Sequence, residues 1–353
     1  MISLFNPNSA ASKDSGIFGL PFRFSESQLV YLPVPWEVTT SYGGGTALGP
    51  RAILAASRQV DLFDAEVLNP FEAGLFMMKE SLEVQRWNEA GKIKARPIIE
   101  CGGDLLNQPE MNQQLKEVNA LGALLNDWVR KETLKLFRDG KIPAIIGGDH
   151  SVPFGALQAA AELFPQIGIL HFDAHSDTRK AFEGFTWSHA SIMHNVIQSI
   201  PQVSKLVQVG IRDFCEEELA FSTLHKNRVK TFYDLQLQNR KFEGASWKVL
   251  CDEIIKELPQ TVWISFDIDG LDPKLCPNTG TPVPGGLDFS EACYLIKQVA
   301  LSGRKIIGFD LNEVAPDLSQ KNEWDANVAA RLLYKLTAWT LYSQGKAELK
   351  SAF

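Results

Sequence analysis

Residues 167–177 have the sequence IGILHFDAHSD, in which a short apolar run ends in a cluster of aspartate and histidine. The same arrangement recurs at residues 261–272, which have the sequence TVWISFDIDGLD. Continuous apolar runs that are rich in Ile and Val are typical of strands buried on both faces of a parallel sheet. Because ligands bind at the carboxyl ends of such strands, these two segments predict both an α/β fold and the place of its functional site.

Further runs of the same kind occur along the chain, separated by segments with helical periodicity. They lie at residues 29–34, 143–148, 205–210 and 305–310. Apolar residues at three- and four-residue steps predict a long helix over residues 112–137, ended by Gly140. Shorter helices are expected at residues 50–57, 153–163, 290–302 and 327–342. Strands that alternate with helices indicate a three-layer α/β/α fold with a mainly parallel sheet.

The domain organisation is expected to be simple. Residues 1–27 are rich in Ser, Asn, Gly and Pro and predict an irregular N-terminal arm. Residues 28–353 contain no repeat and no Gly/Ser-rich linker, so we expect a single domain. Residues 69–110 are the hardest part to assign, because only the PIIE run at 97–100 is a candidate strand. We expect this stretch to be an edge decoration of the fold.

Composition excludes several classes of protein. The 353 residues include 35 Lys and Arg against 42 Asp and Glu, a net charge of -7, so nucleic acid is not an expected partner. No apolar run reaches the roughly 18–20 residues of a membrane span, and residues 1–16 do not have the pattern of a signal peptide. We therefore expect a cytoplasmic protein without a membrane partner. The five scattered cysteines indicate neither a disulfide framework nor a thiolate zinc site.

Histidine and aspartate gather where predicted strands end. Five of the six histidines fall within residues 150–194, and only His225 lies outside. Four polar clusters each follow an apolar run: GGDHS at 147–151, DAHSD at 173–177, DIDGLD at 267–272 and DLNE at 310–313. A single such cluster is usually a turn, but four of them predict one shared site. His171 lies inside an apolar run and is expected to be a core residue, and His194 and His225 are expected to be structural.

Spacing within these clusters brings nitrogen and oxygen donors together, because alternate side chains of an extended segment project to the same side. The candidate metal ligands are His150, Asp173, His175, Asp177, Asp267 and Asp269. Carboxylates this close raise one another's pKa unless a positive charge compensates them. Donors of this number and type suit two divalent ions that share bridging carboxylates. Mn²⁺ is the favoured metal, and Fe, Co and Ni are also compatible with these ligands.

With these motifs in this order, the sequence resembles the ureohydrolase family of arginase, agmatinase, formimidoylglutamase and guanidine hydrolase. GGDHS, DAHxD and SFDxDxxDP are the diagnostic motifs of that family. The resemblance covers about residues 28–345 and includes PWEVTTSYGGGTALGPRAI at 35–53, TGTPVPGGL at 279–287 and GFDLNEVAP at 308–316. It implies an arginase-like fold, a homo-oligomer (trimer or hexamer), and hydrolysis of a C–N bond in a small guanidino or amidino substrate.

The resemblance also implies roles for single residues. One metal would be bound by His150, Asp173, Asp177 and Asp267, and the other by Asp173, His175, Asp267 and Asp269. Asp173 and Asp267 would then bridge the two ions. His189 matches the proton-shuttling histidine of the family, with Asp177 as its partner in proton transfer. Glu313 matches the carboxylate that pairs with the guanidinium group.

Departures from the family pattern bear on the substrate. Ala190 follows His189 where glycine is common, and residues 178–188 lack the Asn/Ser-rich stretch with which arginase holds an α-amino acid. We therefore expect an agmatinase-like enzyme that forms urea and an amine rather than arginase proper.

Three alternatives stay open at this point. A guanidine hydrolase acting on free guanidine and a formimidoylglutamase belong to the same class. Trp36, Trp187 and Trp324 would favour a small substrate if they narrowed the pocket, although core packing is their ordinary role. A metal-stabilised binding protein without catalysis is the alternative from another class, and the complete ligand set with His189 and Glu313 argues against it.

Overall fold

The centre of the molecule is an eight-stranded sheet with the strand order β3-β1-β4-β9-β8-β5-β6-β7. The computed structural model describes residues 5–319 and 322–351. The strands are β1 (Leu29–Pro33), β3 (Leu75–Met77), β4 (Ile142–Ile146), β5 (Ile167–Phe172), β6 (Val203–Ile211), β7 (Val229–Tyr233), β8 (Thr261–Asp267) and β9 (Lys305–Asn312). Within the described residues, neighbouring strands of this sheet are parallel. The apolar runs at residues 29–34, 143–148, 167–173, 205–210, 261–267 and 305–310 each form a strand, as predicted.

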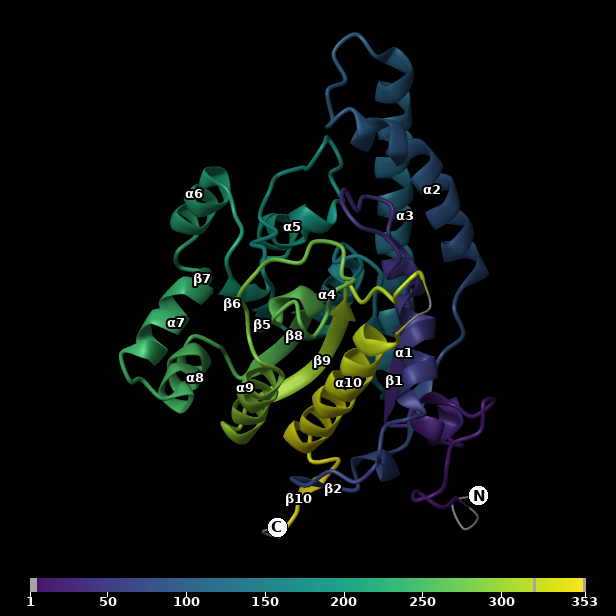
Figure 1. The fold of residues 1–353 in the computed structure, drawn as a ribbon, viewed down its shortest axis with the longest axis vertical. Coiled ribbons are helices and arrows are strands. Elements are labelled where there is room, and N and C mark those ends of the chain that lie inside the picture. Colours follow the sequence, from purple (N-terminus) through teal and green to yellow (C-terminus); the bar gives the residue numbers. More distant parts are fainter. Residues whose placement is uncertain (1–4, 320–321, 352–353) are drawn as a thin grey trace.

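Helices cover both faces of the sheet, which confirms the predicted three-layer fold (Figure 1). They are α1 (Gly49–Ser57), α2 (Leu82–Glu100), α3 (Pro109–Arg138), α4 (Phe154–Leu163), α5 (Ile192–Ser199), α6 (Glu216–Leu224), α7 (Asp234–Phe242), α8 (Trp247–Lys256), α9 (Phe289–Leu301) and α10 (Trp324–Ser343). The helices predicted from periodicity correspond to α1, α3, α4, α9 and α10. Short 3₁₀ helices lie at Ile17–Gly19, Phe24–Glu26, Thr46–Leu48, Pro70–Ala73, His189–Ser191 and Ile268–Gly270. Strands β2 (Val67–Leu68) and β10 (Glu348–Leu349) form a separate antiparallel pair.

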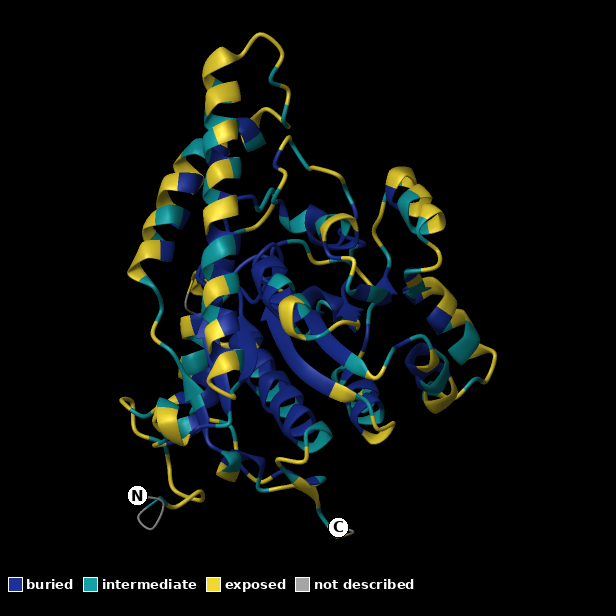
Figure 2. Cartoon of the chain, turned by 180° about the vertical axis from the view of Figure 1, so that it is seen from behind, coloured by how far each residue is buried: buried dark blue, intermediate teal, exposed yellow. Residues whose placement is uncertain are grey.

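Strand β1 shows how one sheet contributes to two hydrophobic cores. Leu29 and Tyr31 pack in the core shared with α1, α8, α9 and α10, whereas Val30 and Leu32 pack in the core shared with α2, α3, α4 and α5. Alternate side chains of a strand point to opposite faces, so a strand covered on both faces is apolar at every position. In Figure 2 the sheet and the inner faces of the helices are accordingly buried, and the outer helix faces are exposed.

Residues 69–110 differ from the prediction, because the PIIE run is the last turn of helix α2 and not a strand. Helix α2 begins after Ser81, whose side chain accepts a hydrogen bond from the Val84 N–H at 3.3 Å. Its buried face consists of Val84, Asn88, Gly91, Ala95 and Ile98. Because Asn88 and Gly91 interrupt the apolar residues on this face, the sequence does not show the periodicity from which a helix is predicted. Helices α2 and α3 pack side by side as a long hairpin that projects beyond the sheet (Figure 1).

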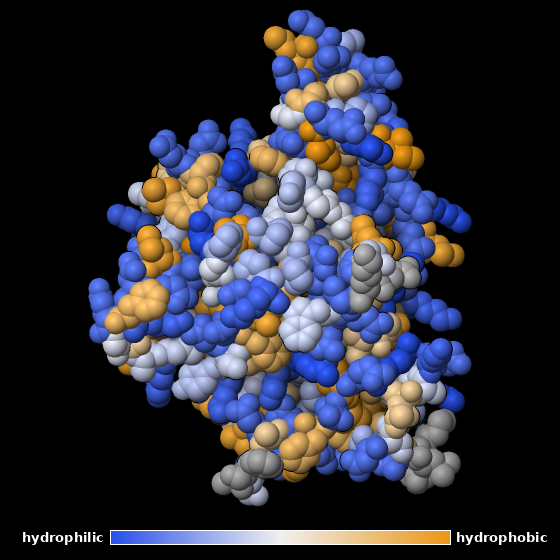
Figure 3. Space-filling view, viewed as in Figure 1, coloured by the Kyte–Doolittle hydropathy of each residue, from blue (hydrophilic) through white to orange (hydrophobic). Residues whose placement is uncertain are grey.

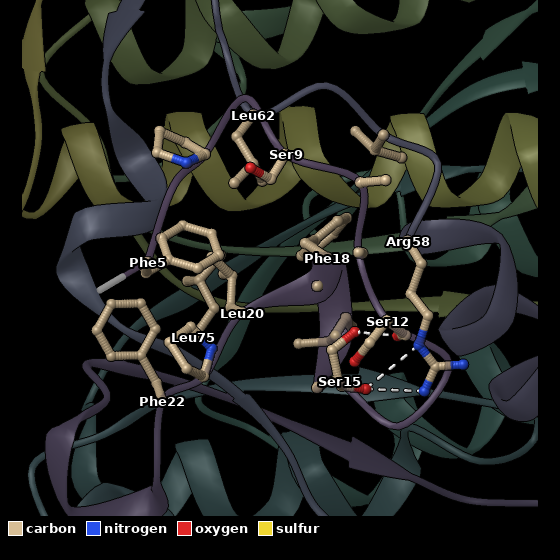
Figure 4. A pocket seen from close by; sticks show the side chains of 18 of the residues that line it. Phe5, Ser9, Ser12, Ser15, Phe18, Leu20, Phe22, Arg58, Leu62 and Leu75 are labelled. Carbon is tan, nitrogen blue, oxygen red and sulfur yellow. Dashed lines mark hydrogen bonds between the residues drawn. The ribbon is translucent and has the colours of Figure 1, made fainter. Parts of the chain in front are cut away.

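The N-terminal arm is irregular in backbone but is attached to the core. Ile17, Phe18 and Leu20 are buried among core residues. The guanidinium of Arg58, at the end of α1, donates hydrogen bonds to the Ser15 carbonyl oxygen at 2.8 and 3.2 Å (Figure 4). Buried apolar side chains and this pair of hydrogen bonds therefore hold the arm against the fold.

The surface is mixed in character. In the view of Figure 3, hydrophilic side chains predominate and apolar ones occur in small groups among them. In residues 5–319 and 322–351, no helix combines the length and the apolar character that crossing a membrane requires.

Candidate functional site

Strands β4, β9, β8 and β5 are neighbours in the sheet, and they end at the same edge. One of the polar clusters that the sequence indicated lies at the end of each strand or directly after it. The backbone N–H of His150, after β4, donates to Glu313 Oε1, after β9, at 2.9 Å, although 163 residues separate them in sequence. The parallel topology therefore assembles the site from distant segments, as the sequence predicted.

Unusual backbone geometry accompanies this assembly. A Cβ atom at Gly148 would lie 1.8 Å from the carbonyl oxygen of Trp36, so the loop after β4 needs a glycine there. Asp177 and Glu313 have φ angles of 54° and 60°, in the left-handed region. A non-glycine residue in that region costs roughly 1–2 kcal/mol, and such strain is retained mainly at functional sites.

His150 is surrounded by acidic side chains. Its Nδ1 atom lies 2.9 Å from Asp173 Oδ2, 3.2 Å from Asp267 Oδ2 and 3.3 Å from Asp177 Oδ2. All four side chains are buried. Burial alone would lower the pKa of His150, but the three carboxylates raise it well above its ordinary value. This point in the structure therefore requires a positive charge, either a proton or a metal ion.

The other ring nitrogen of His150 is fixed by a buried chain of hydrogen bonds. The Ser265 hydroxyl donates to Asp310 Oδ1 at 2.8 Å, and its oxygen lies 2.9 Å from His150 Nε2. Because the serine proton is directed at Asp310, the serine oxygen accepts the proton of His150 Nε2–H. The lone pair of the neutral imidazole is then on Nδ1 and faces the carboxylates, which is the orientation that a metal ligand needs.

A second group of donors shares Asp173 with the first. His175 Nδ1 lies 3.0 Å from Asp269 Oδ2 and 3.4 Å from Asp173 Oδ1. Asp173 thus turns Oδ2 toward His150 and Oδ1 toward His175. The donor groups with atoms within 4.8 Å of one another are His150, His171, Asp173 and Asp177, and Asp173, His175 and Asp269. A carboxylate with one oxygen in each group is suited to bridging two metal ions.

Asp267 contacts the first donor group with only one of its oxygens. Its Oδ2 faces His150 at 3.2 Å, whereas Oδ1 accepts the backbone N–H of Asp269 at 2.8 Å. Burial raises the pKa of Asp267 well above its ordinary value, and the nearby Asp269 and Asp173 add to that shift. The bridging role that the family resemblance implies for Asp267 stays a prediction.

His171 has a contact that the sequence analysis did not anticipate. It is fully buried, as expected of a core residue, but its Nε2 lies 2.8 Å from Asp173 Oδ2. Its Nδ1 lies 3.1 Å from the side-chain nitrogen of Gln208. Since that amide donates to Nδ1, Nε2 carries the proton and donates to Asp173. Residues two positions apart in a strand project to the same side. The residue two positions before Asp173 is His171, and the residue two positions before Asp267 is Ser265, so the sequence contains a signal for both.

His189 and Glu313 lie together beside these donors. His189 Nδ1 is 3.8 Å from Glu313 Oε1. In the part of the chain that the structure describes, no hydrogen-bond partner reaches His189 Nε2 or Glu313 Oε2, although both atoms are buried. Buried polar atoms without partners are rare, so we expect each of them to contact a polar ligand. Gly280 keeps this space open, because a Cβ atom there would lie 3.3 Å from Glu313 Oε2.

The pKa shifts follow from burying so many acids in one place. Burial raises the pKa of Glu313 well above its ordinary value, and the charge of Asp267 adds to this. Burial likewise raises the pKa of Asp177 to about 7, with Asp173 contributing. Burial lowers the pKa of His189 to about 4. Divalent ions would compensate the same negative charge, and oxygen and imidazole donors without a thiolate are suited to such ions.

A cavity of 120 Å³ is lined by His175, Asp177 and His189 together with the charged residues Arg179, Asp213 and Glu218. Arg179 Nε lies 3.6 Å from Glu218 Oε2, so these two charges balance each other. The exposed carboxylate of Asp213 has no ion-pair partner among residues 5–319 and 322–351. Among the charged side chains of the lining that are not proposed metal ligands, Asp213 is therefore the unpaired one.

The tryptophans that were candidates to narrow the pocket do not line this cavity. Trp36 is buried in the core. Trp187 packs against Phe154, with their ring centroids 5.0 Å apart. Trp324 begins helix α10 and is 46% exposed. Trp36 and Trp187 thus have the core-packing role that is ordinary for tryptophan, and the three residues give no support for a small substrate.

Comparison with known proteins identifies similar sequences and folds over nearly the whole chain. The model of the Arginase family matches residues 27–338. The N(1)-aminopropylagmatine ureohydrolase of Thermus thermophilus is 32% identical over 313 residues, covering 88% of this chain and 89% of that protein. The agmatinase of Neisseria meningitidis is 29% identical, with 93% and 94% covered. The structure of the agmatine ureohydrolase of Thermoplasma volcanium has the same fold, with a TM-score of 0.71, 22% identity and 98% of both chains covered.

Proposed function

The chain belongs to the arginase family, and on that premise we propose that it hydrolyses an aminoalkylguanidine of the agmatine type to urea and an amine. Family membership implies a binuclear centre of divalent metal ions. The observation that carries the proposal is the unpartnered pair of buried atoms, Glu313 Oε2 and His189 Nε2, beside two donor groups that share Asp173.

The proposed metal ligands are those expected from the sequence: His150, Asp173, His175, Asp177, Asp267 and Asp269. When bound, the two ions supply a water molecule with a pKa lowered to near neutrality as the nucleophile. Mn²⁺ is the proposed metal, and Ni, Co and Fe are compatible with the same donors. His171 and Ser265 hold Asp173 and His150 in the orientation that this role requires.

Glu313 is proposed to bind and orient the guanidinium group. Its Oε1 accepts the His150 N–H, which fixes the carboxylate in place. Its free Oε2 is available to accept an N–H of the substrate, and a charge-assisted hydrogen bond of this kind sets the plane of the cation. Holding the guanidinium carbon in one position converts the attack of water into a step within a bound complex.

His189 and Asp177 are proposed to move the proton. The leaving nitrogen must receive a proton, since an amide anion is too basic to leave. His189 Nε2 is unpartnered in the described structure and lines the cavity together with Asp177. The backbone N–H of His189 donates to Thr39 Oγ1 at 3.3 Å, which holds the residue in this place.

Asp213 favours a substrate with a positively charged tail. Its free carboxylate lines the cavity and is available to an ammonium group at the far end of the substrate. Free guanidine has no such group, and the carboxylates of formiminoglutamate would be repelled by Asp213. The named activities of the relatives in Thermus and Neisseria also concern agmatine and its aminopropyl derivative.

A substrate panel tests the proposal. Protein loaded with Mn²⁺, and in parallel with Ni²⁺, is assayed for urea and formamide release. The substrates are arginine, agmatine, N1-aminopropylagmatine, 4-guanidinobutyrate, guanidine and formiminoglutamate. We expect urea from agmatine or its aminopropyl derivative with the highest kcat/KM. Preference for guanidine, or formamide from formiminoglutamate, would contradict the proposal, and no release from any substrate would favour a binding protein.

A trimeric or hexameric assembly and a cytoplasmic location stay predictions.

A further inference from the structure

Helix α2 contacts the chain where it leaves β1 and enters the Gly-rich loop, residues 37–45. The Glu37 N–H donates to Asn88 Oδ1 at 2.7 Å. One turn further along α2, the ammonium of Lys92 forms an ion pair with Glu37 Oε1. Between them, a Cβ atom at Gly91 would lie 2.8 Å from Val38 Cγ2, so glycine permits the close approach. Residues at this spacing share one face of a helix, and this face of α2 binds the start of the loop.

The other oxygen of Glu37 holds the far end of the same loop. Glu37 Oε2 accepts the backbone N–H groups of Gly45 and Ala47, each at 2.8 Å, and lies 3.3 Å from Thr46 Oγ1. The Glu37 side chain is buried. A buried carboxylate needs this number of donors to offset its lost hydration. Glu37 lies at the start of the loop and its side chain binds the backbone at the end of the loop, so it connects the two ends. Lys92 provides the positive charge that pairs with the Glu37 carboxylate.

The loop between these ends forms part of the wall of the substrate site. Thr39 Oγ1 accepts the backbone N–H of His189 at 3.3 Å, and Ser41 lines the cavity. Gly43 lies against Gly280, where a Cβ atom would be 2.7 Å from the Gly280 carbonyl oxygen. Gly280 in turn borders Glu313 Oε2. A shift of the loop would thus change the surroundings of both His189 and Glu313.

We propose that Asn88 and Lys92 of α2 are positioning residues for the substrate: through Glu37 they fix the Gly-rich loop against His189 and Gly280. Residues 69–110, which were the hardest part of the sequence to assign, thereby gain a role in shaping the pocket. The proposal goes beyond the proposed function. Only its kinetic test depends on that function.

Two lysines of α2 provide a matched pair for the kinetic test. Lys92 pairs with Glu37, whereas Lys94 pairs with Glu117 of α3 at 2.6 Å. The side chains are similarly exposed, at 46% and 36%. Lys92→Met should raise KM for agmatine about 3- to 10-fold, the scale of one partly exposed ion pair, with less change in kcat and unchanged metal content. Lys94→Met should leave KM within about 2-fold, and Lys92→Arg should restore most of the loss. Equal KM values for Lys92→Met and Lys94→Met would overturn the proposal.

Amide hydrogen exchange tests the same idea without a substrate. In Lys92→Met and in Asn88→Ala, peptides covering residues 38–47 should exchange about 3- to 10-fold faster than in the unmodified protein. Lys94→Met should leave exchange there unchanged. Equal protection of residues 38–47 in all of these proteins would overturn the proposal. If no guanidino compound is hydrolysed, the proposed function fails and the exchange result alone decides this inference.

Discussion

The site has two parts, here called the floor and the rim, which differ in how many contacts their side chains make. The floor, formed by His150, Asp173, His175 and the residues bonded to them, is densely connected: the Asp173 carboxylate alone lies within 3.4 Å of three imidazoles. The rim, formed by Arg179, Asp213 and the Gly-rich loop, contains a carboxylate without a partner in the described residues. The donors of the floor suit metal ions and the rim carries an unpaired charge, so we propose that the floor defines the reaction and the rim the substrate.

The largest effect is expected from breaking the centre of the floor. Asp173 faces both donor groups, whereas Asp269 belongs to one. Asp173→Asn should therefore lose both ions and all measurable turnover, while Asp269→Asn should keep about one ion per chain. Elemental analysis of both purified variants measures the difference. Equal metal retention in the two variants would contradict the distinction between a shared and an unshared ligand.

His189 lies beside the metal donors of the floor and lines the cavity. Its substitution should lower the rate of the chemical step and leave metal binding unchanged. His189→Asn keeps a polar side chain without a titrating imidazole, so kcat should fall by roughly 10²–10⁴-fold. Metal content should not change, because His189 lies outside both donor groups. Steady-state kinetics combined with metal analysis is the check. Full activity with two metals bound would move the proton-transfer role to Asp177 or solvent.

Substitution of Ser265 tests whether the hydrogen bond to His150 contributes to metal affinity. Ser265→Ala removes the acceptor for His150 Nε2–H, so the imidazole is no longer held with Nδ1 toward the carboxylates. Metal affinity should fall roughly 10–100-fold, as is typical when the partner of a metal-bound histidine is lost. Titration of the metal-free protein with Mn²⁺ measures this. Affinity equal to that of the unmodified protein would show that the orientation of His150 does not depend on Ser265.

The smallest effect is expected at the rim. Asp213→Asn should lower the ratio of kcat/KM for agmatine to that for butylguanidine, which lacks the ammonium group, by about 3- to 10-fold. Glu217→Gln is the matched control, since Glu217 is also exposed and lies on α6 but does not line the cavity. An unchanged ratio in Asp213→Asn, or an equal change in Glu217→Gln, would mean that Asp213 does not recognise the tail.

Much of the floor could be predicted from the sequence because its residues follow recognisable strands at a fixed spacing. His171 and Ser265 were not predicted as site residues, because they lie within apolar runs that are typical of core, although the two-residue step from Asp173 and Asp267 leads to them. Asp310 was visible in a predicted cluster, but only the packing of β8 against β9 shows its bond to Ser265.

The rim and α2 were harder to predict for a different reason. The buried face of α2 contains Asn88 and Gly91, whose value lies in their contacts with Glu37 and Val38. Those contacts join segments more than 50 residues apart, as the separation of Glu37 and Asn88 shows. Sequence periodicity reports which side chains are apolar and carries no information about such polar contacts.

Metal stoichiometry tests the central claim most directly. If Asp173 joins two donor groups into one binuclear floor, protein saturated with Mn²⁺ and freed of excess metal should contain about two ions per chain. The Glu313→Gln variant should contain the same amount, because Glu313 belongs to neither donor group. A ceiling of one ion per chain under saturating metal would contradict the binuclear site and the hydrolytic function built on it.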